Sequence, residues 1–357
     1  MGVYEKKISV KELVEKSSKL TIPQNFLRLD QEASSTSDPS TFPTPPIIDM
    51  SRLLSPQHSR SELLNLHSAC IQWGLFQLVN HGVSLSLLGG LKHEIEGFFE
   101  LPLEEKMKYG MRSGEVEGYG TVVRSMEQKL DWGDRVYIIT NPLSRRKPHL
   151  LPSLPLYLRN ALESYLKETR KIAMTLFGMI AGNLNIEVRK LEELFEDGME
   201  AIRMSYYPPC PTPELVVGLR PHSDASGLTI LNQLNGVEGL QVKKDGIWFP
   251  VSFIPDAFIV NVGDIIEIIS NGLYNSIEHR ATVNSEKERM SIAVFYNPRF
   301  DGEIAPFTAS QLNPPLFKNI IMEDYFKDFF TQSFNGKSHL DRMKIPTTQQ
   351  PNPSPTY

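Results

Sequence analysis

Two histidines and an aspartate have the residue types and spacing of a metal site. His222 and Asp224 lie two positions apart in the segment PHSDA, and His279 occurs much further along the chain. In an extended segment, residues two apart point to the same side, so His222 and Asp224 can offer two ligands to one ion while His279 arrives from a distant strand. Two imidazoles and one carboxylate, with coordination positions left open, are typical of a mononuclear non-haem Fe(II) centre. The alternative is that these are ordinary polar residues, because a His-x-Asp triplet also occurs by chance in many proteins.

Arg289 and Ser291 form a second pair with chemical potential, at the entry to the apolar run 291–296. Because they lie two apart in a predicted strand, both side chains can face one interior. A guanidinium that faces inward requires an anion there, and its planar fork pairs bidentately with a carboxylate. The alternative is a surface arginine near Glu286 and Glu288. Beside the metal triad, the pair favours a carboxylate ligand next to the ion.

A row of polar residues occupies one face of the predicted strand 202–207. Alternation places Arg203, Ser205 and Tyr207 on the same side, where a buried strand should show apolar residues. Polar groups that face a protein core require a hydrogen-bonding partner, so this face favours a bound ligand. The alternative is that the face is solvated.

The elements that must position these residues follow from hydrophobic periodicity and capping signals. Many short strands at close spacing in the C-terminal half indicate a jelly roll, which can enclose a cavity at one end. We expect an α+β fold with a double-stranded β-helix (jelly roll) core flanked by helices, and a helix-rich N-terminal domain. The predicted helices cover 9–16, 59–74, 86–101, 158–180 and 322–330, and the predicted strands cover 46–49, 75–80, 202–207, 228–233, 240–242, 257–262 and 291–296.

The predicted organisation has five parts. Residues 1–45 form an N-terminal helix and a linker rich in Ser, Thr and Pro, which resist helix and bury little. Residues 46–195 form an N-terminal domain with a long helix, and residues 196–300 form the jelly-roll domain with the metal site. A helical segment over 301–345 and a disordered tail over 346–357 complete the chain.

Composition limits the classes of partner and compartment. The 37 basic and 42 acidic residues give a net charge of −5 without an Arg-rich block, which argues against nucleic acid as a partner. Cys70 and Cys210 are the only cysteines and fit neither a disulfide framework nor a zinc motif, which favours a reducing cytosol. No apolar run approaches the ~20 residues of a membrane span, and the N-terminus lacks the apolar core of a signal peptide. We therefore expect a cytoplasmic protein, monomeric by default, that binds a small molecule.

Long stretches of the chain resemble the plant 2-oxoglutarate- and Fe(II)-dependent dioxygenases, which have the isopenicillin N synthase-like fold. The catalytic core of that family is similar to SYYPPCPTPELVVGLRPHSDASGLTIL, DAFIVNVGDIIEIISNGLYNSIEHRATVN and KERMSIAVFYNP. Its N-terminal domain is similar to PPIIDMSRLL and ACIQWGLFQLVNHGVS. The resemblance implies an enzyme that uses Fe(II), 2-oxoglutarate and O2, with ascorbate as the reductant.

The resemblance also assigns roles to the residues of the site. The implied iron ligands are His222, Asp224 and His279. The implied contacts to 2-oxoglutarate are Arg289 and Ser291, which hold the distal carboxylate, and Tyr207, which adds a hydrogen bond. Ser205 is a departure, since the family usually has Asn there. A hydroxyl can still hydrogen-bond the co-substrate, but with a shorter reach.

Within the family, GYGTVVRSMEQKLDWGDRVYIITNPLSRRKPHLLP resembles most the senescence-related-type clade that contains the morphinan alkaloid O-demethylases. The clade implies hydroxylation or O-demethylation of a plant specialised metabolite, such as an alkaloid, a flavonoid or another phenolic, with release of succinate and CO2. The residues expected to border the substrate are Arg203, Tyr119, Val122, Phe295 and Asn297.

Three other functions use the same triad. A jelly roll that holds a metal without catalysis has no need of Arg289, Ser291 or Tyr207. A zinc hydrolase would require a general base over the metal-bound water. An iron oxidase without 2-oxoglutarate, like the related ring-closing oxidases, is compatible with the arginine and the serine.

Overall fold

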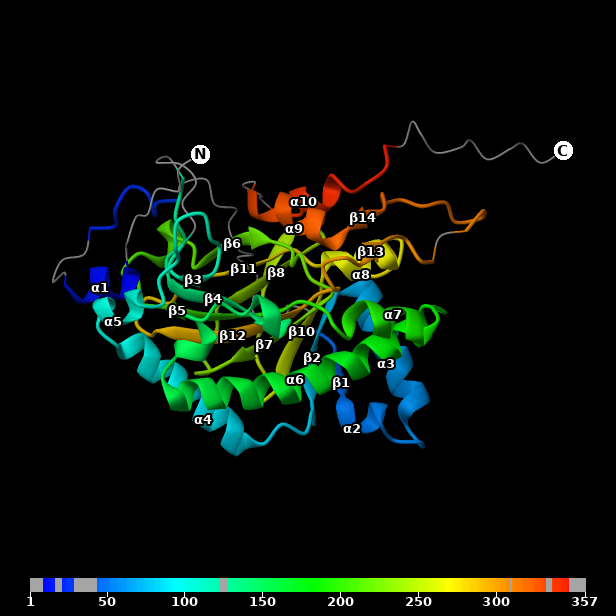
Figure 1. The fold of residues 1–357 in the computed structure, drawn as a ribbon, viewed down its shortest axis with the longest axis horizontal. Helices are drawn as coiled ribbons and strands as arrows, with labels where there is room; N and C mark the ends of the chain where they lie inside the picture. Colours follow the sequence, from blue (N-terminus) through cyan, green and yellow to red (C-terminus); the bar gives the residue numbers. More distant parts are fainter. Residues whose placement is uncertain are drawn as a thin grey trace.

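The computed structural model describes residues 9–16, 21–28, 44–121, 128–308, 310–331 and 336–346. The strands form a large sheet and a smaller one that face each other, as in a jelly roll, and α-helices cover the outer face of the large sheet (Figure 1). The predicted fold class is therefore confirmed.

The large sheet has eight strands and carries most of the fold. Its neighbouring strands run antiparallel except for the first pair, which is parallel. In spatial order the strands are β1 (Ile47–Asp49), β2 (Leu75–Val79), β10 (Phe258–Val262), β7 (Leu228–Gln233), β12 (Arg289–Tyr296), β5 (Glu200–Tyr207), β4 (Asp134–Asn141) and β3 (Gly118–Tyr119).

The small sheet carries both histidines of the triad. It has four strands, in the order β6 (Leu219–His222), β11 (His279–Ala281), β8 (Leu240–Lys244) and β9 (Ile247–Pro250). A third sheet pairs β13 (Glu303–Ile304) with β14 (Ile320–Ile321).

The helices of the described chain lie around these sheets. Figure 1 shows α6, the predicted long helix, and α4 along one face of the large sheet, while α9 and α10 lie on the opposite side of the molecule. None of the described helices combines the length and the apolar character that a membrane span requires. The helices are α1 (Val10–Glu15), α2 (Met50–Leu53), α3 (Ser59–Gln72), α4 (Leu85–Glu100), α5 (Leu103–Met107), α6 (Leu156–Asn183), α7 (Val188–Phe195), α8 (Asp264–Ile269), α9 (Met322–Thr331) and α10 (Ser338–Asp341).

The two faces of the large sheet differ in chemistry, and this difference creates the site. On the face towards α4 and α6, apolar side chains such as Met204, Ile292 and Ile230 join the main hydrophobic core. On the other face, the alternate residues include Arg203 and Arg289. Because successive side chains of a strand point to opposite faces, one sequence pattern builds both the core and a polar interior.

The predicted elements are present, with shifts of a few residues at their ends. Ser9 caps α1 by accepting a hydrogen bond from the backbone N–H of Glu12, as the capping box predicts. The strands β4, β6 and β11 were not predicted. Both β6 and β11 are short, and neither shows clear alternation of apolar residues, so periodicity could not reveal them.

The described parts of the segment 9–28 pack against the large sheet near the start of β4. The buried carboxylate of Asp134 accepts hydrogen bonds from the Ser9 hydroxyl (2.6 Å), the Val10 backbone N–H (2.7 Å) and the Tyr119 hydroxyl (2.8 Å). Phe26 lies edge-on to Trp132, with ring centroids 5.3 Å apart. The N-terminal segment is thus tied to the start of β4.

Asp134→Ala should lower the free energy of unfolding by about 2–4 kcal/mol, because three buried donors lose their acceptor. Urea denaturation measures this loss. Asp301→Ala, which removes a carboxylate whose side chain is 80% exposed, is the control and should change stability by less than about 0.5 kcal/mol. Equal effects of the two substitutions would show that Asp134 does not anchor the N-terminal segment.

Candidate active site

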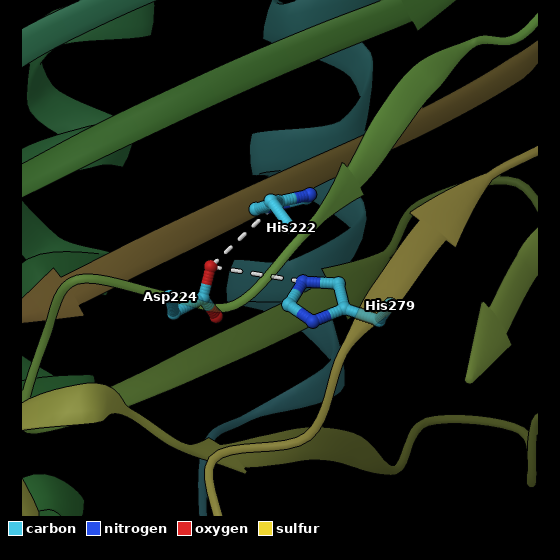
Figure 2. Close-up of side chains that lie close together, drawn as sticks. All are labelled: His222, Asp224 and His279. Carbon is cyan, nitrogen blue, oxygen red and sulfur yellow. Dashed lines mark ion pairs between the residues drawn. The ribbon is translucent and has the colours of Figure 1, made fainter. Parts of the chain in front are cut away.

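The metal triad is assembled by the pairing of β6 with β11. His222 ends β6, His279 begins β11, and the two residues are direct partners across the antiparallel pair. Asp224 lies in the loop that follows β6. All three side chains point toward one another (Figure 2), and their potential ligand atoms lie within 4.8 Å of each other. The Nε2 atoms of both histidines are 3.6 Å from Oδ1 of Asp224.

Backbone carbonyls fix the orientation of both imidazoles. Nδ1 of His222 lies 2.8 Å from the carbonyl oxygen of Arg220, and Nδ1 of His279 lies 3.1 Å from that of Ile277. An Nδ1–H that donates to a carbonyl leaves the Nε2 lone pair available for a metal ion. Nε2 of His222 is buried and has no hydrogen-bond partner within the described chain. This orphaned atom is the ligand that a metal ion would use.

The protonation states also suit a metal ion. Burial, reinforced by the neighbouring His279, lowers the pKa of His222 to about 3, so its imidazole is neutral at pH 7. Burial alone would raise the pKa of Asp224, but the two histidines, Arg203 and a hydrogen bond from Asn261 together hold it below its usual value. Neutral imidazoles and an ionised carboxylate are the forms that bind metal ions. The residues therefore fit Fe(II).

Arg289 is buried on the inner face of the large sheet, where it pairs with Tyr207 of β5. Its Nη2 donates to Oε1 of Gln233 at 2.8 Å, whereas its Nε has no hydrogen-bond partner among the described residues. Burial lowers the pKa of Arg289, and no carboxylate of the described chain lies within ion-pair distance of it. An uncompensated buried charge is costly, so this guanidinium requires an anionic ligand.

A polar row beside Arg289 continues across four strands. Ser291 on β12 lies opposite Ser205 on β5 and Gln233 on β7, and Ser205 lies opposite Arg135 on β4. Among the predicted co-substrate contacts, Arg289 and Tyr207 are thus cross-strand neighbours, as are Ser291 and Ser205. Gln233 was missed, although its alternation along β7 places it on the polar face.

A cavity of about 240 Å³ opens beside the triad and is lined by His222 and Asp224. Three of the residues predicted to border the substrate line it: Arg203, Phe295 and Asn297. Tyr119 is outside this lining, since its hydroxyl donates to Asp134 on the side of the N-terminal segment. The prediction of a substrate contact for Tyr119 is therefore corrected. Val122 lies outside the described residues.

Aromatic residues form much of the remaining lining. The ring of Tyr137 lies 6.3 Å from that of Phe295 and 6.0 Å from that of Phe330. Phe326 and Phe329, on the same helix as Phe330, also line the cavity. These α9 residues were missed because the apolar pattern of a helix does not show which sheet it covers.

Asp131 also lies in the wall of the same cavity. Its buried carboxylate faces Arg28, Arg135 and Arg220, at 3.3, 2.9 and 3.4 Å. Burial raises the pKa of Asp131, but the three arginines outweigh this effect and lower it overall. Three guanidinium groups therefore converge on one carboxylate at the wall of the cavity.

Comparison with known proteins identifies the family. The model of the 2OG-Fe(II) oxygenase superfamily matches residues 198–298, and that of the N-terminal domain of non-haem dioxygenases in morphine synthesis matches residues 45–154. Oxoglutarate-dependent flavonoid 7-O-demethylase 1 of Ocimum basilicum is 48% identical over 94% of this chain and 91% of its own length. This chain belongs to the 2OG-Fe(II) oxygenase superfamily. Codeine O-demethylase of Papaver somniferum is 50% identical over 85% of this chain and 86% of its own length.

A solved structure supports the same assignment for this 2OG-Fe(II) oxygenase. The crystal structure of JOX2 in complex with 2OG, Fe and JA has a TM-score of 0.84 and 35% identity, and the match covers 95% of this chain and 98% of that one. The predicted family, the enzyme class and the use of Fe(II) and 2-oxoglutarate are confirmed. Catalysis is accordingly favoured over metal binding alone.

The structure adds Asn261 to the site. Its amide donates to Oδ2 of Asp224 at 3.2 Å from the neighbouring strand β10, and so directs the other carboxylate oxygen towards the histidines. Such supporting hydrogen bonds orient metal ligands and raise affinity. Sequence patterns gave no signal for this contact, because it joins a strand and a loop that are distant in the chain.

Asn261→Ala should weaken Fe(II) binding about tenfold or more, because Asp224 loses the hydrogen bond that orients it. Anaerobic titration of the purified protein with Fe(II) measures the affinity. Asn319→Ala, at an exposed position, is the control and should leave it unchanged. An unaltered affinity in Asn261→Ala would show that the hydrogen bond does not support the metal ligand.

Proposed function

We propose that this 2OG-Fe(II) oxygenase demethylates or hydroxylates a flat phenolic compound, with a methoxylated flavonoid as the preferred class. The observation that carries the proposal is the joint lining of one cavity by two residues of the metal triad, His222 and Asp224, by three aromatic rings and by Arg203. Oxidation of an O-methyl carbon gives a hemiacetal, which releases formaldehyde and leaves a free hydroxyl group on the ring.

The proposed roles within the site follow from its geometry. His222, Asp224 and His279 hold Fe(II), and Arg289 binds the distal carboxylate of 2-oxoglutarate with Ser291, Ser205 and Tyr207 beside it. When bound, iron and 2-oxoglutarate supply the O2-dependent oxidation of a substrate C–H bond, with succinate and CO2 as by-products. The chain itself positions these groups and excludes water from them, which restricts the oxidation to the bound substrate.

The aromatic walls support a flat substrate. Tyr137 is tilted by 56° against Phe295 and by 53° against Phe330, so the rings enclose a space rather than stack on one another. Planar ring systems pack well against such faces and edges. Asn297 lines the same space and has a buried carbonyl oxygen without a partner, which can accept a hydrogen bond from a hydroxyl group.

Arg203 favours a phenolic substrate over a protonated amine. Its guanidinium lies 5.2 Å from the centroid of the Phe295 ring, and no carboxylate of the described chain pairs with it. A cation in the wall stabilises phenolate or carbonyl oxygen and repels an ammonium group. The flavonoid demethylase of Ocimum basilicum is therefore a better guide to the substrate than the codeine demethylase.

A panel of methoxylated flavonoids, simple methoxyphenols and amine-bearing methoxylated alkaloids tests the proposed substrate. With Fe(II), 2-oxoglutarate, ascorbate and air, we expect succinate and formaldehyde to form in equal amounts with a flavonoid. Arg203→Met, which keeps an unbranched stem but removes the charged guanidinium, should raise the KM for that flavonoid about tenfold. Faster turnover of the alkaloids by the unmodified enzyme would contradict the proposed class.

Arg289→Ala tests the proposed co-substrate site. Loss of a buried guanidinium that pairs with a carboxylate should raise the KM for 2-oxoglutarate at least about thirtyfold, while Fe(II) affinity stays nearly constant. Succinate formation and anaerobic Fe(II) titration give the two values. Arg299→Ala, at the exposed side of the molecule, is the matched control. An unchanged KM in Arg289→Ala would disprove the assignment.

A further inference from the structure

The side chains of Arg289 and Tyr207 form a stacked pair on the inner face of the large sheet. The guanidinium carbon lies 5.2 Å from the centroid of the tyrosine ring, and both residues are buried. A pair of this kind can hold a carboxylate only if the ring and the guanidinium keep their positions. The hydrogen bond to Gln233 fixes one end of the guanidinium. Other contacts must fix the remainder of the arginine side chain and the tyrosine ring.

Two glycines enclose the ring of Tyr207. A Cβ atom on Gly133 would lie 2.8 Å from Cδ1 of that ring, and a Cβ atom on Gly218 would lie 2.9 Å from the same atom and 3.1 Å from Cε1. Contacts below 3.0 Å are not tolerated, so any larger residue would displace the ring. The tyrosine is therefore packed directly against two stretches of bare backbone.

A third glycine occupies the corresponding position beside Arg289. A Cβ atom on Gly239 would lie 2.7 Å from Cδ and 3.2 Å from Nε of that arginine. It would also lie 2.8 Å from the carbonyl oxygen of Thr282, whose backbone N–H already donates to Gly239 at 2.7 Å. The backbone is thus held where it is, and the arginine would have to move.

The three glycines share a position in the fold. Gly133 directly precedes β4, Gly218 precedes β6, and Gly239 precedes β8. None of them has the positive φ angle at which a side chain is strained, so absence of a side chain, not backbone conformation, is what these positions require. The residues that precede three different strands therefore all contact the side chains of Tyr207 or Arg289.

We infer that Gly133, Gly218 and Gly239 are positioning residues for 2-oxoglutarate, which act through Tyr207 and Arg289. The inference rests on the proposed role of Arg289 in binding the co-substrate. The three glycines, which we name the glycine cradle, set the distance between the ring and the guanidinium. A methyl group in the cradle shifts Arg289 and Tyr207 and weakens 2-oxoglutarate binding, while His222, Asp224 and His279 keep their positions.

Gly218→Ala is the most direct test, because its closest contacts are with the tyrosine ring and its nearest backbone atom is 3.1 Å away. Calorimetric titration of the iron-loaded protein with 2-oxoglutarate under nitrogen should show a dissociation constant raised roughly tenfold. Fe(II) affinity should change less than about twofold. An unchanged affinity for 2-oxoglutarate in this variant would overturn the inference.

Two control variants separate this effect from a general loss of stability. Gly302→Ala also introduces an overlap, with Cδ1 of Leu194 at 2.7 Å, and should lower the melting temperature without affecting 2-oxoglutarate binding. Gly97→Ala lies on an exposed turn of α4 with nothing within 4 Å and should leave both properties intact. Weakened binding in Gly302→Ala equal to that in Gly218→Ala would also overturn the inference.

A double-mutant cycle tests the route through Tyr207. In Tyr207→Leu, which removes the ring that the new methyl group would strike, Gly218→Ala should cause no further loss of 2-oxoglutarate affinity. Additive losses would show that Gly218 acts by another route and would overturn the inference. If Gly218→Ala does not fold, recovery of folding in the double variant supports the ring contact, and failure to recover contradicts it.

The same binding measurements distinguish a failure of the glycine cradle from a failure of the proposed function. If Arg289→Ala weakens 2-oxoglutarate binding and the glycine variants do not, the arginine is the co-substrate ligand and the cradle is wrong. If Arg289→Ala has no effect on 2-oxoglutarate binding, the proposed co-substrate site is wrong, and the inference about the glycine cradle is then wrong as well. Gly239→Ala, which contacts the arginine itself, gives an independent second measurement of the cradle.

Discussion

The site depends on one constraint: the guanidinium of Arg289 is buried, and no carboxylate of the described chain lies within ion-pair distance of it. Arg289 lies inside the molecule with one hydrogen-bond acceptor from Gln233, and the desolvation of its charge opposes folding. The apolar face of the same sheet, packed against α4 and α6, supplies the favourable burial that offsets this cost. The sheet therefore stabilises the fold through one face and holds reactive groups on the other, and a carboxylate ligand relieves the remaining cost.

The sequence predicted the chemical groups better than their surroundings. His222, Asp224 and His279 were found because metal ligands need particular residue types, and the large strands were found because alternation is visible along one segment. Their meeting depends on the register of β6 with β11, which places the histidines directly opposite one another. Register between distant strands is a tertiary property, so only the resemblance to a known family could supply it in advance.

Two kinds of residue were beyond sequence reasoning for different reasons. Tyr119 shows the first kind: it was expected to border the substrate, but its hydroxyl donates to the buried carboxylate of Asp134. Phe330 shows the second kind, because its helical spacing predicts only that some surface is covered. Whether that surface is the core or a substrate cavity depends on how α9 docks, and the docking leaves the ring beside Tyr137. Local patterns describe an element, whereas function here depends on contacts between elements.

The arrangement separates the parts of the enzyme that must stay fixed from those that can vary. His222, His279, Arg289 and Ser291 lie on paired strands, and each of them is constrained by a cross-strand partner. The rings of α9 that line the cavity belong to a helix and not to these paired strands. A change of one ring on α9 alters the shape of the cavity without moving the β6–β11 pair. The same fold can therefore serve relatives that act on flavonoids and on alkaloids, since substrate choice and oxidation chemistry depend on different contacts.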